Sequence, residues 1–149
     1  MKGARRRSRE IALQTLYAWQ LADGDAGQLL EQAAALEGYA RADRELVQAL
    51  VRGVLARAAE IEQLIAPHLL ERGYAELSPV ERAILSIAAF ELLEHPETPF
   101  KVILNEAIEL GKSFGGAEGY KLVNGVLEKL AARLRPDEVA RAAKARQTA

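Results

Sequence analysis

Helix-forming residues dominate this chain throughout, and that bias constrains its fold more than any other feature. Alanine, leucine, glutamate and arginine recur along the whole sequence, and the alternating pattern of half-buried strands is scarce. Half of the 149 residues are apolar, and there is no cysteine. A chain of this size and apolar content can bury a core without disulfides. We therefore predict a single all-α domain.

Turn and cap signals divide the sequence into helices. Ser78-Pro79-Val80-Glu81 combines an N-cap serine, a proline at the first helical position and a glutamate three residues after the cap. Asp43 is another candidate N-cap, and Gly53 in the following helix indicates close packing against a neighbour. Asn124-Gly125 is typical of hairpins, but no partner strand is in view, so we interpret it as helical with the glycine at a close contact. The predicted helices span residues 5–22, 26–36, 44–64, 79–94, 99–114 and 118–134; residues 137–149 have little apolar surface and are expected to be a frayed basic tail.

The net charge of −1 hides an asymmetry along the chain. Residues 1–10 hold five lysines and arginines and one acid, residues 11–132 hold ten against eighteen acids, and residues 133–149 hold five against two. Basic ends suit nucleic acid or an anionic surface, and an acidic body suits a basic protein partner. A solvated surface with basic tails is the alternative interpretation of the same charges.

Several function classes find no support in the sequence. Gly111-Lys112-Ser113 resembles the end of a phosphate-binding loop, but Glu106 stands where that loop needs a glycine. His68 and His95 have no neighbours at ligand spacing, and no catalytic triad is readable, so we expect no enzyme, cofactor or metal site. The longest uncharged run, residues 11–22, is too short to span a bilayer, and no signal peptide is readable. We expect a cytoplasmic protein.

Two clusters of basic and aromatic residues are candidate RNA contacts. On a helical wheel at about 100° per residue, one stripe of the first helix carries basic residues and ends at Tyr17. Cations for phosphates beside a flat ring for a base are what single-stranded RNA requires. The second cluster surrounds Phe114 and the glycines that follow it. For both aromatics a core position is the alternative. The basic candidates are Lys2, Arg6 and Arg9 in the stripe, Arg5 and Arg7 beside it, and Lys112 and Lys121 in the second cluster.

Two glutamates of the 79–94 helix stand out by position. Glu91 falls among the apolar residues of that helix, so its carboxylate should be buried and paired with an arginine or a helix N-terminus. Glu81 lies toward the edge of the apolar face and could be exposed to a basic partner.

Seven segments follow one another along the chain in this order: ARRRSRE, LQTLYAWQ, VERAIL, FEL, PFKVILNEAIEL, KSFG and KLVNGVL. Together they resemble the NusB family of bacterial transcription antitermination factors, and the resemblance covers about residues 2–136. It implies two packed three-helix subdomains, about residues 1–75 and 76–136, with an additional helix. It also implies about seven helices in all and no catalysis.

The resemblance further implies a function and its residues. NusB-like proteins bind boxA, a single-stranded element of ribosomal RNA leader transcripts, together with NusE, a small-subunit ribosomal protein, and join other Nus factors on RNA polymerase. By position, the RNA surface would comprise Lys2, Arg5, Arg6, Arg7, Arg9, Tyr17, Lys112, Phe114 and Lys121, and Glu81 would face NusE. Leu122 stands where family members can carry an aromatic residue, so stacking there is lost or moves to Tyr120.

Two alternatives stay open at this point. A protein-interaction module like the NusB-like domain of ribosomal RNA cytosine methyltransferases would need a methyltransferase domain downstream. A nonspecific polyanion binder would lose nothing when the boxA sequence is scrambled.

Overall fold

A computed structural model describes residues 3–148, without the side chains of residues 116–118, and every regular element in that part of the chain is helical. The all-α prediction is therefore confirmed. The α-helices are α1 (Ala4–Ala22), α2 (Ala26–Ala34), α3 (Arg44–Ala56), α4 (Ala58–Ile65), α5 (Pro79–Glu94), α6 (Phe100–Phe114), α7 (Gly116–Leu134) and α8 (Pro136–Thr148). Short 3-10 turns at Tyr39–Arg41, Ala66–His68 and Tyr74–Glu76 lie between them.

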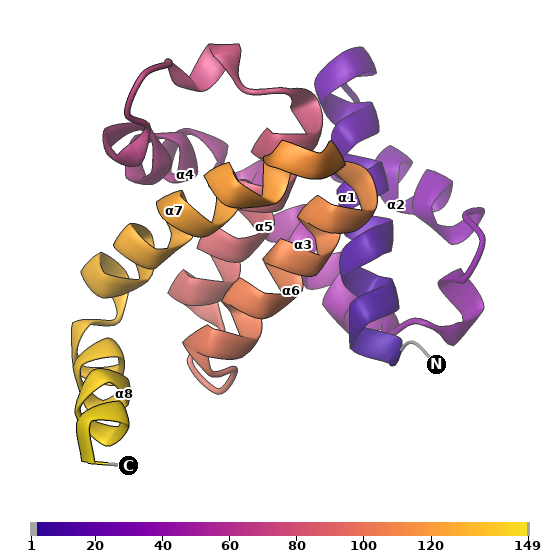
Figure 1. Ribbon diagram of the computed structural model, residues 1–149. Coiled ribbons are helices and arrows are strands. Elements are labelled where there is room, and N and C mark those ends of the chain that lie inside the picture. The colour runs from indigo at the N-terminus through magenta and orange to yellow at the C-terminus, as the bar shows by residue number, and fades with distance from the viewer. Residues whose placement is uncertain (1–2, 149) are drawn as a thin grey trace.

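Helix α5 is the centre of the molecule (Figure 1). Residues 83–92 are all buried, so the helix is surrounded rather than covered on one face. It contacts α1, α3, α4, α6 and α7. The buried apolar side chains of these helices and of α2 form one continuous cluster. The division into subdomains near residue 75 stays a prediction.

Local sequence signals set several of the observed helix ends. Ser78 and Glu81 form a reciprocal capping box at the start of α5, as its sequence predicts. The side chain of Asp43 accepts a hydrogen bond from the Leu46 N–H and caps α3. Helix α1 ends where Gly24 has a φ of 122°, a conformation that favours glycine.

Close helix packing depends on one glycine that the sequence singles out and on one that it does not. A Cβ on Gly53 would overlap the Phe90 ring, so α3 and α5 meet at this position, as predicted. A Cβ on Gly111 would lie 3.1 Å from the Tyr120 Cα, so Gly111 lets α6 and α7 approach closely. Gly125 lies within a helix, as expected, but a Cβ there would meet nothing within 4 Å, so the predicted close contact is wrong.

Two further boundaries differ from the prediction. The expected helix over residues 44–64 is broken at Arg57, and the change of direction lets α4 bury Ile61 and Ile65 against the core. The expected frayed tail is helix α8, which extends away from the body of the molecule (Figure 1). Its first turn is held by Glu138, whose carboxylate accepts a hydrogen bond from the Phe100 N–H at 2.8 Å.

Candidate nucleic-acid interface

Arg9 is buried, contrary to its sequence-based placement in a surface stripe. Its side chain is 3% exposed, and its guanidinium donates two hydrogen bonds of 2.8 Å to the carboxylate of Glu91. Arg9 shares its helical face with the buried Leu13 and Leu16, which turns it toward α5. Glu91 is 1% exposed and has an arginine as its partner. The sequence had left open an arginine or a helix N-terminus for this role.

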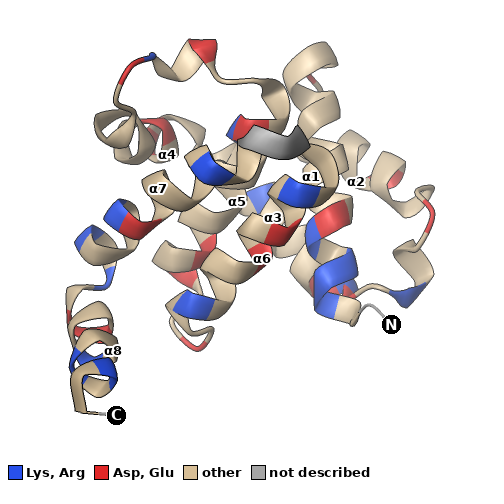
Figure 2. Ribbon diagram, viewed as in Figure 1, with Lys and Arg blue, Asp and Glu red and all other residues tan. Residues whose placement is uncertain are grey.

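The other described arginines at the start of α1 differ in exposure; Figure 2 marks the basic residues of this helix in blue. Arg6 is 43% exposed and donates hydrogen bonds of 2.9 and 3.2 Å to Glu106 on α6. Arg5 lies 3.7 Å from the Asp43 carboxylate and is also exposed, while Arg7 is half-buried. Lys2 lies outside the described residues. The ion pairs of Arg5 and Arg6 thus lie at the surface, where a phosphate could compete for these cations.

Tyr17 and Phe114, which are far apart in the sequence, line one hollow. Its volume is about 410 Å³, and its walls come from α1, the residues after α2, the start of α5 and the end of α6. Tyr17 is 39% and Phe114 41% exposed, so neither ring has the core position that was the alternative for both. The other lining residues are Leu13, Gln14, Leu36 and Val80. An open apolar hollow with two aromatic rings can receive a flat base.

The second basic cluster lies where α6 meets α7. The Lys112 ammonium is 5.6 Å from the centroid of the Tyr120 ring and 3.8 Å from a Glu109 carboxylate oxygen. Lys121 is exposed one residue further along α7. The sequence pointed to Gly111 only as part of a phosphate loop; in the structure this glycine lets α6 approach Tyr120 of α7 closely.

Glu81 is not exposed to a partner, contrary to the sequence-based expectation. The residue is 9% exposed, and its carboxylate accepts a hydrogen bond of 2.9 Å from the Ser78 N–H. A second contact, 3.8 Å long, joins it to Arg72. The capping box that the sequence predicts therefore occupies this side chain.

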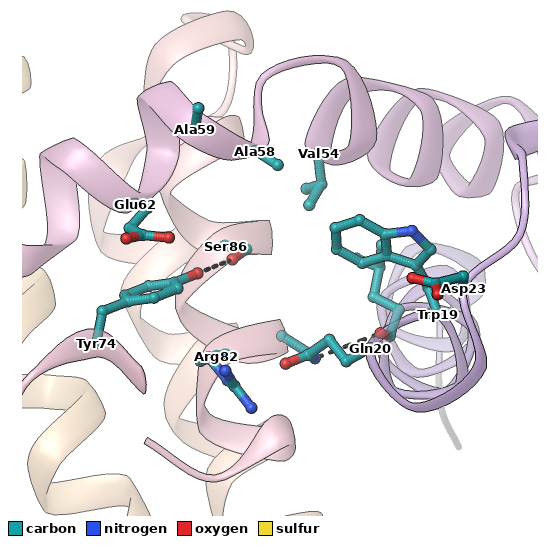
Figure 3. A pocket seen from close by; sticks show the side chains of 12 residues that line it. Trp19, Gln20, Asp23, Val54, Ala58, Ala59, Glu62, Tyr74, Arg82 and Ser86 are labelled. Atoms are coloured by element: carbon teal, nitrogen blue, oxygen red, sulfur yellow. Dashed lines mark hydrogen bonds between the residues drawn. The ribbon is translucent and has the colours of Figure 1, made fainter. Parts of the chain in front are cut away.

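A separate hollow of about 450 Å³ lies between the end of α1, the α3–α4 junction and the start of α5 (Figure 3). It is lined by groups of both signs, among them Asp23, Glu62 and Arg82. Two buried polar atoms, Gln20 Oε1 and Arg82 Nε, have no hydrogen-bond partner in the described part of the chain. Burial raises the pKa of the Tyr74 hydroxyl, which also faces this hollow. Its mixed charge suits a polar protein side chain better than a phosphate.

Two further features are absent from the described residues. No helix among them is long and apolar enough to cross a membrane. They also contain no group of three or more histidine, aspartate or glutamate residues placed to hold a metal ion.

The fold and its surface define a class of protein: an all-α domain that presents cations and open aromatic rings, the two groups that bind single-stranded nucleic acid. Comparison with known proteins narrows the class. The model of the NusB family matches residues 6–132, and the chain belongs to this family.

Individual relatives agree with the family assignment. Proteins named "Transcription antitermination protein NusB" from Burkholderia cenocepacia and Burkholderia vietnamiensis are 53% identical over 137 residues, which is 92% of this chain and 94% of theirs. The solved structure of NusB from T. maritima superposes with a TM-score of 0.82 at 32% identity, covering 95% of this chain and 99% of the other. A structure of antitermination factors NusB and NusE in complex with dsRNA matches with a TM-score of 0.74 over 86% of this chain and 96% of the matched one; at 23% identity this match shows the fold alone.

Proposed function

We propose that this protein is a transcription antitermination factor that binds single-stranded boxA RNA of ribosomal RNA leader transcripts together with NusE. It acts in the cytoplasm as part of the Nus factor complex on RNA polymerase. The relatives support this role: proteins named as transcription antitermination proteins are 53% identical to this chain, and the match covers 92% of it.

The hollow that Tyr17 and Phe114 share is the observation that carries the proposal. It offers a base an apolar site, and the same two helices carry exposed cations for phosphates, Arg5 and Arg6 at the start of α1 and Lys112 near the end of α6. The proposed RNA surface comprises the two rings with Arg5, Arg6, Arg7, Lys112 and Lys121, to which Lys2 is added from the sequence alone. Arg9 is removed from it because its charge is buried against Glu91.

The NusE-facing surface is also revised. Glu81 caps α5, so we propose the partner contact at the hollow of Figure 3, where Asp23 just after α1 and Glu62 of α4 line an open space. Asp23 and Glu62 would meet basic side chains of the partner.

Fluorescence anisotropy tests the proposed function. A labelled boxA RNA and a scrambled RNA are titrated with the protein, with and without NusE, over a salt series. The boxA RNA should bind more tightly than the scramble, and NusE should tighten it further. Five phosphate contacts predict a slope of about −3.5 for log affinity against log salt on a single strand. Equal binding of both RNAs with no effect of NusE would leave only a nonspecific polyanion binder.

A further inference from the structure

A groove beside α7 plays no part in the RNA and NusE surfaces proposed above. Its volume is about 270 Å³, and it lies between α7 and the segment that follows α4. Arg72, Lys121 and Lys129 line it together with Leu70 and other apolar side chains, against one acid, Glu71. A groove with a surplus of cations and an apolar floor fits a polyanion that also has apolar faces.

One face of α7 supplies the positive wall. Lys121, Gly125, Lys129 and Arg133 follow one another at four-residue intervals, so they form a row along the helix. On the opposite wall, burial and then the nearby charges of Arg133 and Lys129 lower the pKa of His68. Burial is the larger cause, and the Nε2 atom of that ring has no hydrogen-bond partner in the described part of the chain.

Gly125 is the observation that points to an occupant. A glycine inside a helix is less stable than an alanine. Here a Cβ would meet nothing within 4 Å, so packing within the chain does not explain the missing side chain. Gly125 nevertheless lines the groove, between the cations of the row. A ligand that lies against the helix backbone would require the absence of a side chain.

We propose that this groove binds the phosphodiester backbone of the RNA strand that continues beyond the boxA element. Lys121 joins the groove to the proposed boxA surface, because this residue belongs to both. The strand leaves the base-binding hollow, passes the α6–α7 contact and follows the row of cations toward Arg133. This inference rests on the proposed function and extends it from the recognised element to its flank.

The test compares two RNAs and two matched variants. One RNA is the boxA element alone, and the other carries unstructured runs of uridine at both ends. The groove variant is Lys129→Glu with Arg133→Glu, and the control is Arg141→Glu with Lys144→Glu on α8. All four positions are exposed, and both variants change the charge equally.

The extended RNA should bind the unaltered protein more tightly than boxA alone. The groove variant should weaken the extended RNA about tenfold and lower its salt slope by about 1.4, since each phosphate on a single strand contributes about 0.7. The control variant should still bind the extended RNA more tightly than boxA alone, and this difference in affinity is the advantage of the extended RNA. Gly125→Leu should remove that advantage while the protein stays folded, because the new side chain enters open space.

A second readout does not depend on affinity. The chain has two histidines, so the ring signals of His68 can be followed by NMR, with His95 as an internal reference. Bound phosphate groups offset the field of Arg133 and Lys129, so the extended RNA should raise the pKa of His68 and boxA alone should not.

The possible failures are distinct. If boxA alone does not bind, the proposed function fails. If boxA binds but the extension adds nothing and the His68 pKa does not move, the groove is not an RNA site. Loss of NusE binding in the groove variant, with both RNAs unaffected, would make the groove a protein contact and overturn the inference.

Discussion

At the scale of single residues, the Arg9–Glu91 pair shows how burial reverses the meaning of a charge. Both side chains are almost fully enclosed and joined by two hydrogen bonds of 2.8 Å. A buried pair contributes little relative to apolar residues, but removal of one partner strands the other charge in the core. Arg9 therefore connects α1 to α5 and is not available to an RNA phosphate.

Arg9→Ala should lower the free energy of unfolding by about 3–5 kcal/mol, because the buried carboxylate of Glu91 loses both of its hydrogen bonds to Arg9 and keeps only a 3.8 Å contact with His95 Nδ1. Arg6→Ala on the same helix should cost at most about 1 kcal/mol, because Arg6 and its ion pair with Glu106 lie at the surface. Urea unfolding followed by circular dichroism measures both variants. Similar small losses for the two would show that the buried pair does not hold α1 to α5.

Glu81→Ala should destabilise the protein by about 1 kcal/mol, because it removes half of the capping box of α5. Glu81→Gln should retain most of that stability, since an amide oxygen also accepts from the Ser78 N–H. Thermal unfolding of both variants, with NusE binding measured on the same samples, separates the cap from partner recognition. A Glu81→Ala protein of unchanged stability that no longer binds NusE would restore the original assignment.

At the scale of helices, the junction between α7 and α8 closes the end of the bundle. The Arg135 guanidinium donates to backbone carbonyls at the end of α5 and in the loop after it, at 2.6 to 3.0 Å. Glu138 accepts from Arg135 and from the first N–H of α6. Backbone carbonyls at the end of α5 and the first N–H of α6 thus gain hydrogen bonds from residues far away in the sequence.

The Glu138 contacts predict a pH dependence. Burial raises the pKa of Glu138, but the Phe100 N–H and Arg135 outweigh it and hold this pKa below its ordinary value of 4.5. Stabilisation is therefore complete above about pH 5 and is lost as the pH falls through the folded-state pKa. At neutral pH the unaltered protein should have a higher melting temperature than the Glu138→Gln variant, and this difference in melting temperature should vanish in acid. A constant difference across that range would mean that ionisation of Glu138 is not involved.

Comparison of individual elements shows which features the sequence could predict. The caps at Asp43 and Ser78 and the glycine contact at Gly53 follow from local rules, and each was predicted. The break at Arg57 carries no glycine or proline signal. Helix α8 was missed because its first turn depends on contacts with residues about forty positions earlier.

At the scale of the whole molecule, the fold assembles surfaces that no single segment contains. The sequence identified Tyr17 and Phe114 separately, but only the packing of α1 against the rest of the bundle places them in one hollow. The same packing buries Arg9, three residues from the exposed Arg6 on the same helix. A helical wheel could not separate these two arginines, because the position of the partner helix is not a local property.

Tyr17→Ala and Phe114→Ala should each weaken boxA binding by about 1–3 kcal/mol if each ring stacks on a base. Both side chains are about two-fifths exposed, so the melting temperature should change little. Val102→Ala is the matched control: this side chain is 41% exposed and lies about 18 Å from Phe114 along α6. It should bind boxA like the unaltered protein.

The double variant Tyr17→Ala with Phe114→Ala distinguishes one shared seat from two independent contacts. If both rings enclose the same base, removal of the first already frees that base, so the double variant should lose less affinity than the sum of the single losses. Additive losses would mean that each ring holds a different base. If both single variants bind boxA normally but melt far lower, the rings support the fold, and the hollow between α1 and α6 is not where RNA binds.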